Sequence, residues 1–186
     1  MARVDTKVTQ ARDVRRTEVT RLFEVAETIR DDALLWARAG LGILDRGLEL
    51  EDLFERPRFV DRFKYGLAKG VAESIAANDQ RVQAIYLYDI EVNSDIEAGY
   101  ELPIEASVHQ LALVSAPSAA LESFIASLDR ALVEGLRELP TRLYKERDWI
   151  LDVKLITEHE VKNRTGYACL LNSTYSPALE IWKRMA

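Results

Sequence analysis

The sequence predicts an α+β fold, in which a small mixed β-sheet packs on helices and a helical region precedes it. Two observations lead to this prediction. Apolar residues recur at steps of three and four over residues 1–80, whereas short apolar runs separated by polar stretches follow from residue 81 onward. The chain has 186 residues, of which 48% are hydrophobic and 30% charged, which is typical of globular proteins. We therefore expect a helical N-terminal region (1–80) and an α+β domain (81–186) that form one compact unit.

The N-terminal region contains three predicted helices. The first carries an apolar stripe over Val19–Trp36, and Gly40 and Gly42 mark its end. A short second helix ends before Pro57, and the third has an apolar residue at every fourth position over Phe59–Ile75. Each stripe needs an apolar partner. That partner is the sheet of the same chain, a second copy of the chain, or another protein.

The second region contains strands with one helix between them. Val82–Val92 and Ser107–Ser115 are rich in aliphatic residues and too short for stable helices, so we expect two strands. An amphipathic helix over Leu121–Leu139 follows, and Trp149–Thr157 is the third predicted strand. We expect short helices to complete the chain.

Two segments of this region resemble parts of the minimal nucleotidyltransferases, which belong to the DNA polymerase β-like superfamily. One is Val82–Val92 together with Ser107–Ser115. The other is Ile150–Trp182, which reads ILDVKLITEHEVKNRTGYACLLNSTYSPALEIW. A strand, a short helix, a GY turn and the LLNSTYSPALEIW tail are similar to the closing stretch of that fold. The resemblance covers the chain from Val82 onward and implies a nucleotidyltransferase-like sheet.

The resemblance also implies a degenerate active site. Members of the family transfer a nucleoside monophosphate with two divalent metals that three carboxylates hold. A Gly-Ser turn precedes these carboxylates in the sequence. In this chain the Gly-Ser turn falls on Asp89 and Ile90, and the paired acids fall on Val108 and Gln110. Only the third acid has a counterpart, Asp152. We therefore expect that two-metal catalysis is lost, and that the domain binds a nucleotide near Asp89, Ile90 and Gln110 or contacts another protein.

Two alternatives remain open. Asp95 and Glu97 lie in the string S-D-I-E, which many active members share, so they and Asp152 would hold Mg²⁺ in an active, divergent enzyme. Asp89-Ile90-Glu91 is a second D-x-E string. Asp152 also has an ordinary interpretation, as an ion pair with Lys154 on the same face of a strand.

The other alternative is a structural or regulatory subunit that assembles through its N-terminal helices, as a homo-oligomer or with a partner.

Composition sets expectations for partners and location. The net charge is −6, so we expect binding neither to nucleic acid nor to a membrane surface. The N-terminus is too charged for a secretory signal. The single cysteine, Cys169, fits the cytoplasm and is predicted to lie in the core.

His109 and His159 lack partners at metal-ligand or triad spacing, so we expect structural or solvated roles. We expect no cofactor unless the enzyme is active with Mg²⁺.

Overall fold

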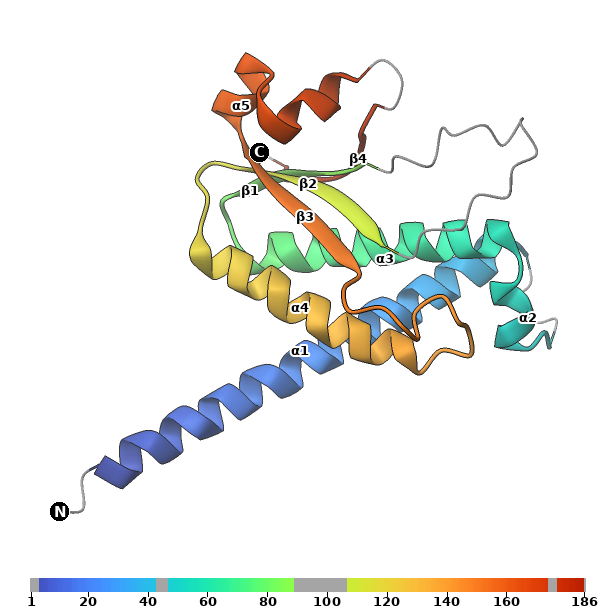
Figure 1. The fold of residues 1–186 in the computed structure, drawn as a ribbon, viewed down its shortest axis with the longest axis horizontal. Coiled ribbons are helices and arrows are strands. Elements are labelled where there is room, and N and C mark those ends of the chain that lie inside the picture. Colours follow the sequence, from blue (N-terminus) through green and yellow to red (C-terminus); the bar gives the residue numbers. More distant parts are fainter. Residues whose placement is uncertain (1–3, 43–46, 89–106, 174–176, 186) are drawn as a thin grey trace.

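The helices of the described chain lie mainly on one side of a four-stranded sheet (Figure 1). The computed structural model describes residues 4–42, 47–88, 107–173 and 177–185. In chain order the elements are α1 (Val4–Gly40), α2 (Leu50–Phe54), α3 (Pro57–Asn78), β1 (Val82–Leu87), β2 (Val108–Val114), α4 (Ala119–Arg137), β3 (Leu151–Thr157), α5 (Glu158–Asn163), the 3₁₀ helix η2 (Gly166–Asn172) and β4 (Leu179–Lys183). This arrangement confirms the predicted fold class.

The first and third helices pack against each other through small residues. On α1 the buried residues that face this contact include Ala26, Ile29 and Ala33. A Cβ atom placed on Gly66 of α3 would lie 2.9 Å from the Cα of Ala33, so the two backbones approach closely at this point. The apolar stripe predicted for the third helix is confirmed on α3. Its residues at every fourth position over Phe59–Ile75 are all buried.

The strands form a mixed sheet in the order β3-β2-β1-β4. β1 pairs antiparallel with both β2 and β4, whereas β2 and β3 are parallel because α4 carries the chain back between them. The strand β4 was not predicted, since only short helices were expected at this end of the chain. Its sequence, LEIWK, lies at the sheet edge, where none of its side chains is fully buried, so it lacks the apolar run that marked the other strands.

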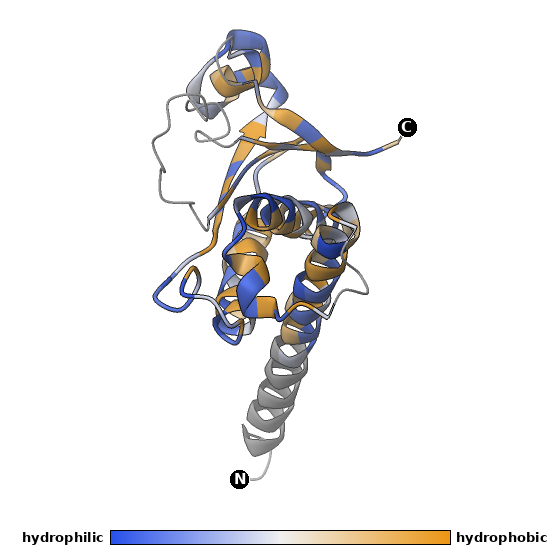
Figure 2. Ribbon diagram, turned by 90° about the vertical axis from the view of Figure 1, so that its right-hand side faces the viewer, coloured by the Kyte–Doolittle hydropathy of each residue, from blue (hydrophilic) through white to orange (hydrophobic). Residues whose placement is uncertain are grey.

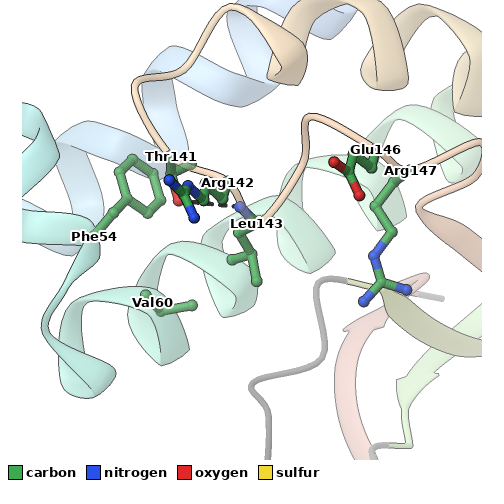
Figure 3. A pocket seen from close by; sticks show the side chains of 7 residues that line it. All are labelled: Phe54, Val60, Thr141, Arg142, Leu143, Glu146 and Arg147. Atoms are coloured by element: carbon green, nitrogen blue, oxygen red, sulfur yellow. Dashed lines mark hydrogen bonds between the residues drawn. The ribbon is translucent and has the colours of Figure 1, made fainter.

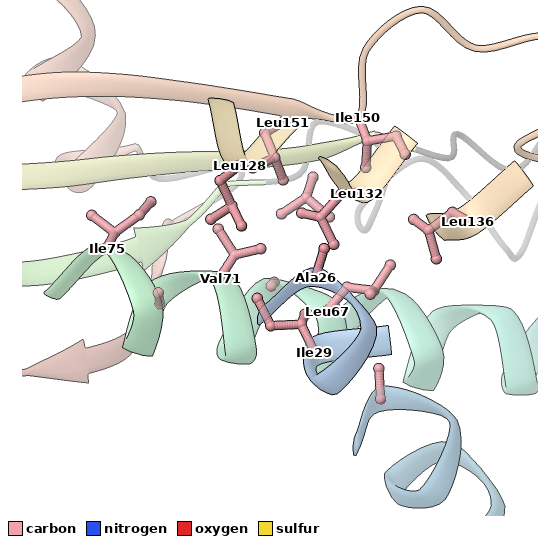
Figure 4. Packing of buried hydrophobic residues seen from close by; sticks show 14 of the residues in the cluster. Ala26, Ile29, Leu67, Val71, Ile75, Leu128, Leu132, Leu136, Ile150 and Leu151 are labelled. Carbon is pink, nitrogen blue, oxygen red and sulfur yellow. The ribbon is translucent and has the colours of Figure 1, made fainter. Parts of the chain in front are cut away.

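One hydrophobic cluster joins the N-terminal helices to the sheet. Figure 4 shows Leu128 and Leu132 of α4 beside Val71 of α3, Ala26 of α1 and Leu151 of β3. Residues of both predicted regions therefore share one core. Burying these aliphatic side chains stabilises the fold, at roughly 1.5–3 kcal/mol for each fully buried one.

Part of the second face of the sheet is covered by the C-terminal segment. Figure 2 shows α5 and η2 on the side of the sheet that is opposite to the long helices. Ala168 of η2 packs here with Leu111 and Ile156 in a smaller apolar cluster. The prediction of a buried Cys169 was wrong, because the only buried residue of η2 is its neighbour Ala168, and Cys169 is exposed.

Candidate functional site

Polar side chains gather on the second face of the sheet, where β2 and β3 run side by side. The parallel register places His109 of β2 directly beside Asp152 of β3. Lys154 follows two positions after Asp152, and alternate residues of a strand share a face. Because the pairing is parallel and in register, residues from two distant segments of the sequence meet at one place.

The carboxylate of Asp152 is the centre of this group. Its Oδ1 lies 2.6 Å from the Nζ of Lys154, and its Oδ2 lies 3.3 Å from the Nδ1 of His109. The hydroxyl of Tyr88, just after β1, donates to the same Oδ2 at 3.3 Å. These four side chains form a hydrogen-bonded unit that joins β2 and β3 to the end of β1. We call them, with Trp149 and Tyr167, the sheet-face cluster.

Two exposed aromatic rings flank the polar unit. The Nζ of Lys154 lies 5.2 Å from the ring centre of Tyr167, which belongs to η2. The ring of Trp149 meets that of His109 edge to face at 6.2 Å. Trp149 is 44% exposed and Tyr167 is 51% exposed, so both rings remain accessible from solvent. The cluster therefore presents aromatic surface next to a cation.

The charges of the cluster follow from its contacts. Burial by itself raises the pKa of Asp152, but the hydrogen bond and charge of Lys154, together with His109, outweigh burial and place this pKa below its ordinary value. The hydrogen bond to Asp152 raises the pKa of Lys154. Burial, aided by the charge of Asp152, raises the pKa of Tyr88 well above its ordinary value. Near neutral pH the cluster thus holds a carboxylate, an ammonium and a protonated phenol.

The described residues do not fit a two-metal cage. Asp152 and His109 are two potential ligands, and no group of three or more acid, histidine or cysteine side chains suited to a metal occurs in the described part of the chain. In addition, Lys154 already holds one oxygen of Asp152. The geometry matches the ordinary ion-pair interpretation of Asp152.

The predicted site residues do not come together in the described chain. Val108 and Gln110 point to the helices, whereas Asp152 lies on the opposite face of the sheet. Gln110 is fully buried and its Nε2 donates to the backbone oxygen of Ala68 at 2.6 Å. Because side chains alternate along a strand, the residues of β2 that share the face of Asp152 are His109, Leu111 and Leu113.

Four other predicted site residues cannot be placed. Asp89, Ile90, Asp95 and Glu97 lie outside the described residues, as does the rest of the predicted strand beyond residue 88.

Sequence reasoning missed part of this cluster. His109 was expected to be structural or solvated, and no role was predicted for Trp149 or Tyr167. The signal that could have identified His109 is the predicted order strand, helix, strand over β2, α4 and β3. Such strands are commonly parallel neighbours, and aligning them brings His109 and Asp152 together.

Comparison with known proteins adds no family to this picture. No family model, curated protein or solved structure matches the chain. Among the described residues, no helix combines the length and apolar character needed to cross a bilayer. The nucleotidyltransferase resemblance therefore stays a prediction.

Proposed function

We propose that this chain is a nucleotidyltransferase-like domain that has lost two-metal catalysis and binds a nucleotide, without a divalent cation, at the sheet-face cluster. The observation that carries the proposal is the contact of 2.6 Å between the Nζ of Lys154 and the Oδ1 of Asp152. In a two-metal enzyme a metal would occupy this side of the acid. Here a lysine supplies the positive charge.

The composition of the cluster suits a nucleotide. A base stacks on an aromatic side chain with about 1–3 kcal/mol per base, and Trp149 and Tyr167 both expose their rings. The ammonium of Lys154 uses one of its three donors on Asp152, so it retains donors for a phosphate oxygen. Phosphate binding would thus need no metal. The negative charge of the phosphate would compete with the carboxylate of Asp152 for the ammonium of Lys154.

A thermal-shift series with ATP, CTP, GTP and UTP, each in Mg²⁺ and in EDTA, tests this proposal. A ligand that binds only the folded state raises the melting temperature. We expect a rise with at least one nucleotide that is equal in Mg²⁺ and in EDTA. Trp149→Ala should weaken the affinity about tenfold, since losing one stacking contact costs about 1–3 kcal/mol.

Matched lysine variants locate the phosphate contact. Lys154→Gln should weaken binding about tenfold, because a hydrogen bond to a charged group contributes roughly 1.5–3 kcal/mol. Lys162→Gln removes the same charge from an exposed position on α5 and should leave the affinity unchanged. No shift with any nucleotide at millimolar concentration would refute nucleotide binding.

The same series separates the proposal from an active enzyme. A shift that requires Mg²⁺, disappears in Asp152→Ala and is accompanied by release of pyrophosphate would overturn the loss of catalysis. In that case Asp95 and Glu97 would be the acids to replace next.

One observation favours a second function, assembly through α1. Leu35 and Trp36 are 59% and 41% exposed on this helix, and the ring of Trp36 lies 5.1 Å from that of Tyr65 on α3. We propose that this surface contacts a second copy of the chain. Light scattering after size exclusion should then give a dimer mass that Leu35→Glu reduces to that of the monomer. A monomer mass for the unmodified chain at tens of micromolar would exclude this function.

A further inference from the structure

A pocket lies among the helices, and no residue of the sheet-face cluster lines it. It has a volume of about 710 Å³ and lies between α2, the start of α3 and the segment that follows α4 (Figure 3). Its apolar walls come from Phe54, Val60 and Leu143, and its polar ones from Thr141, Arg142, Glu146 and Arg147. Small-molecule sites commonly have a volume of about 300–1,000 Å³ and combine mainly apolar walls with a few polar groups.

The segment over residues 141–147 is fixed by several contacts. Tyr144 is fully buried and meets Phe63 of α3 edge to face at 6.0 Å. The backbone N–H of Leu143 donates to the Oγ1 of Thr141 at 3.2 Å, and Arg137 of α4 donates to the backbone oxygen of Arg147 at 3.1 Å. The backbone that carries the polar wall of the pocket is therefore fixed by contacts with α3 and α4.

The polar wall carries an excess of positive charge. Neither Arg142 nor Arg147 forms an ion pair with a carboxylate in the described part of the chain. Figure 3 shows the guanidinium of Arg142 directed toward Phe54, while the side chain of Arg147 extends away from the carboxylate of Glu146. Two guanidinium groups against one carboxylate leave one net positive charge beside an apolar wall.

We propose that this pocket binds a small amphipathic monoanion, of the class of aliphatic carboxylates. The hydrocarbon chain lies against Phe54, Val60 and Leu143. The carboxylate pairs with Arg142, whose guanidinium lies beside Phe54, while Arg147 contributes its charge from the far end of the wall (Figure 3). Arginine suits this role because its planar fork of donors matches a carboxylate. The negative charge of Glu146 disfavours ligands with more than one negative charge, so the single excess charge selects a monoanion. This site is independent of the nucleotide site.

Calorimetric titration of the full chain with octanoate and with 1-octanol tests the proposal. The two probes share the hydrocarbon chain and differ in charge. We expect saturable octanoate binding that is about tenfold tighter than that of the alcohol, since a charge-assisted hydrogen bond accounts for at least a factor of ten. The double variant Arg142→Gln/Arg147→Gln should bind octanoate only as weakly as 1-octanol.

Two further variants complete the design. Arg130→Gln removes an exposed arginine of α4 outside the pocket and should leave the octanoate affinity unchanged. Glu146→Gln should raise this affinity about threefold, because it removes a like charge at an exposed site. Octanoate that fails to saturate, or binds the double variant as tightly as the unmodified chain, overturns the proposal. If circular dichroism shows that the double variant does not fold, an unchanged affinity in Glu146→Gln overturns it instead.

Discussion

The contact between α1 and α3 predicts opposite effects for the same substitution at two glycines. At Gly66 the new Cβ of alanine would lie 2.9 Å from the Cα and 3.1 Å from the Cβ of Ala33. Carbon atoms prefer separations of about 3.5–4.0 Å, so the two helices must move apart by roughly half an ångström. The obstacle is backbone, which cannot rotate away as a side chain does. At Gly135 of α4 an added Cβ meets nothing within 4 Å.

The magnitudes follow from two competing effects. Replacing glycine by alanine inside a helix stabilises it by about 1 kcal/mol, and this gain applies at both positions. Overpacking a tight contact costs about 1–3 kcal/mol, and this cost applies only at Gly66. We therefore expect Gly135→Ala to raise the free energy of unfolding by about 1 kcal/mol and Gly66→Ala to lower it by up to about 2 kcal/mol.

Urea unfolding followed by far-ultraviolet circular dichroism measures this difference. A change of 1 kcal/mol also shifts the melting temperature of a chain of this size by about 2–4 °C. Gly70→Ala is the intermediate case, because its Cβ would lie 3.0 Å from a methyl group of Ile29, a side chain that can adjust. If Gly66→Ala is as stable as Gly135→Ala, the close approach of α1 and α3 is refuted.

Two further predictions concern the start of β3 and the carboxylate of the sheet-face cluster. Oδ1 of Asp129 on α4 accepts from the backbone N–H groups of Ile150 and Leu151, each at 2.8 Å. Asp129→Ala should therefore lower the free energy of unfolding, measured in urea, by about 2–3 kcal/mol. Asp129→Asn keeps an acceptor and should lower it less. The pKa of Asp152 lies below its ordinary value of 3.8, so the folded state favours the ionised carboxylate. The stability that this carboxylate contributes is complete above that ordinary value and is lost as the pH falls through the lower folded-state pKa. The free energy of unfolding, measured from pH 6 to about pH 2, should therefore fall less steeply in Asp152→Asn than in the unmodified chain. Parallel curves of this free energy against pH would refute the depressed pKa.

Strong periodicity made much of the fold predictable. The apolar residues at every fourth position over Phe59–Ile75 share one face of a helix, and the run is too long for an ordinary strand. The structure buries them all on α3. The apolar runs at β1, β2 and β3 were likewise long enough to identify. The edge strand β4 was missed because partial burial leaves no such signal, and Cys169 was misplaced because a 3₁₀ turn does not bury neighbouring residues equally.

The site was harder to predict, because it depends on which face each strand residue occupies. A displacement of one residue moves a side chain to the other face of a sheet. The family resemblance assigned the paired acids to Val108 and Gln110, which face the helices, while Asp152 faces the opposite side. His109, one position away from each of them, is the β2 residue that contacts Asp152.

The sequence by itself determined the α+β fold class, the three N-terminal helices and the first three strands, because hydrophobic periodicity acts over a few neighbouring residues. Tertiary structure alone decided the pairing of His109 with Asp152, the close approach of Gly66 to Ala33 and the pocket beside Arg142. Each of these joins segments that are far apart in the chain. Their relative position depends on strand register and helix packing, which are properties of the whole core.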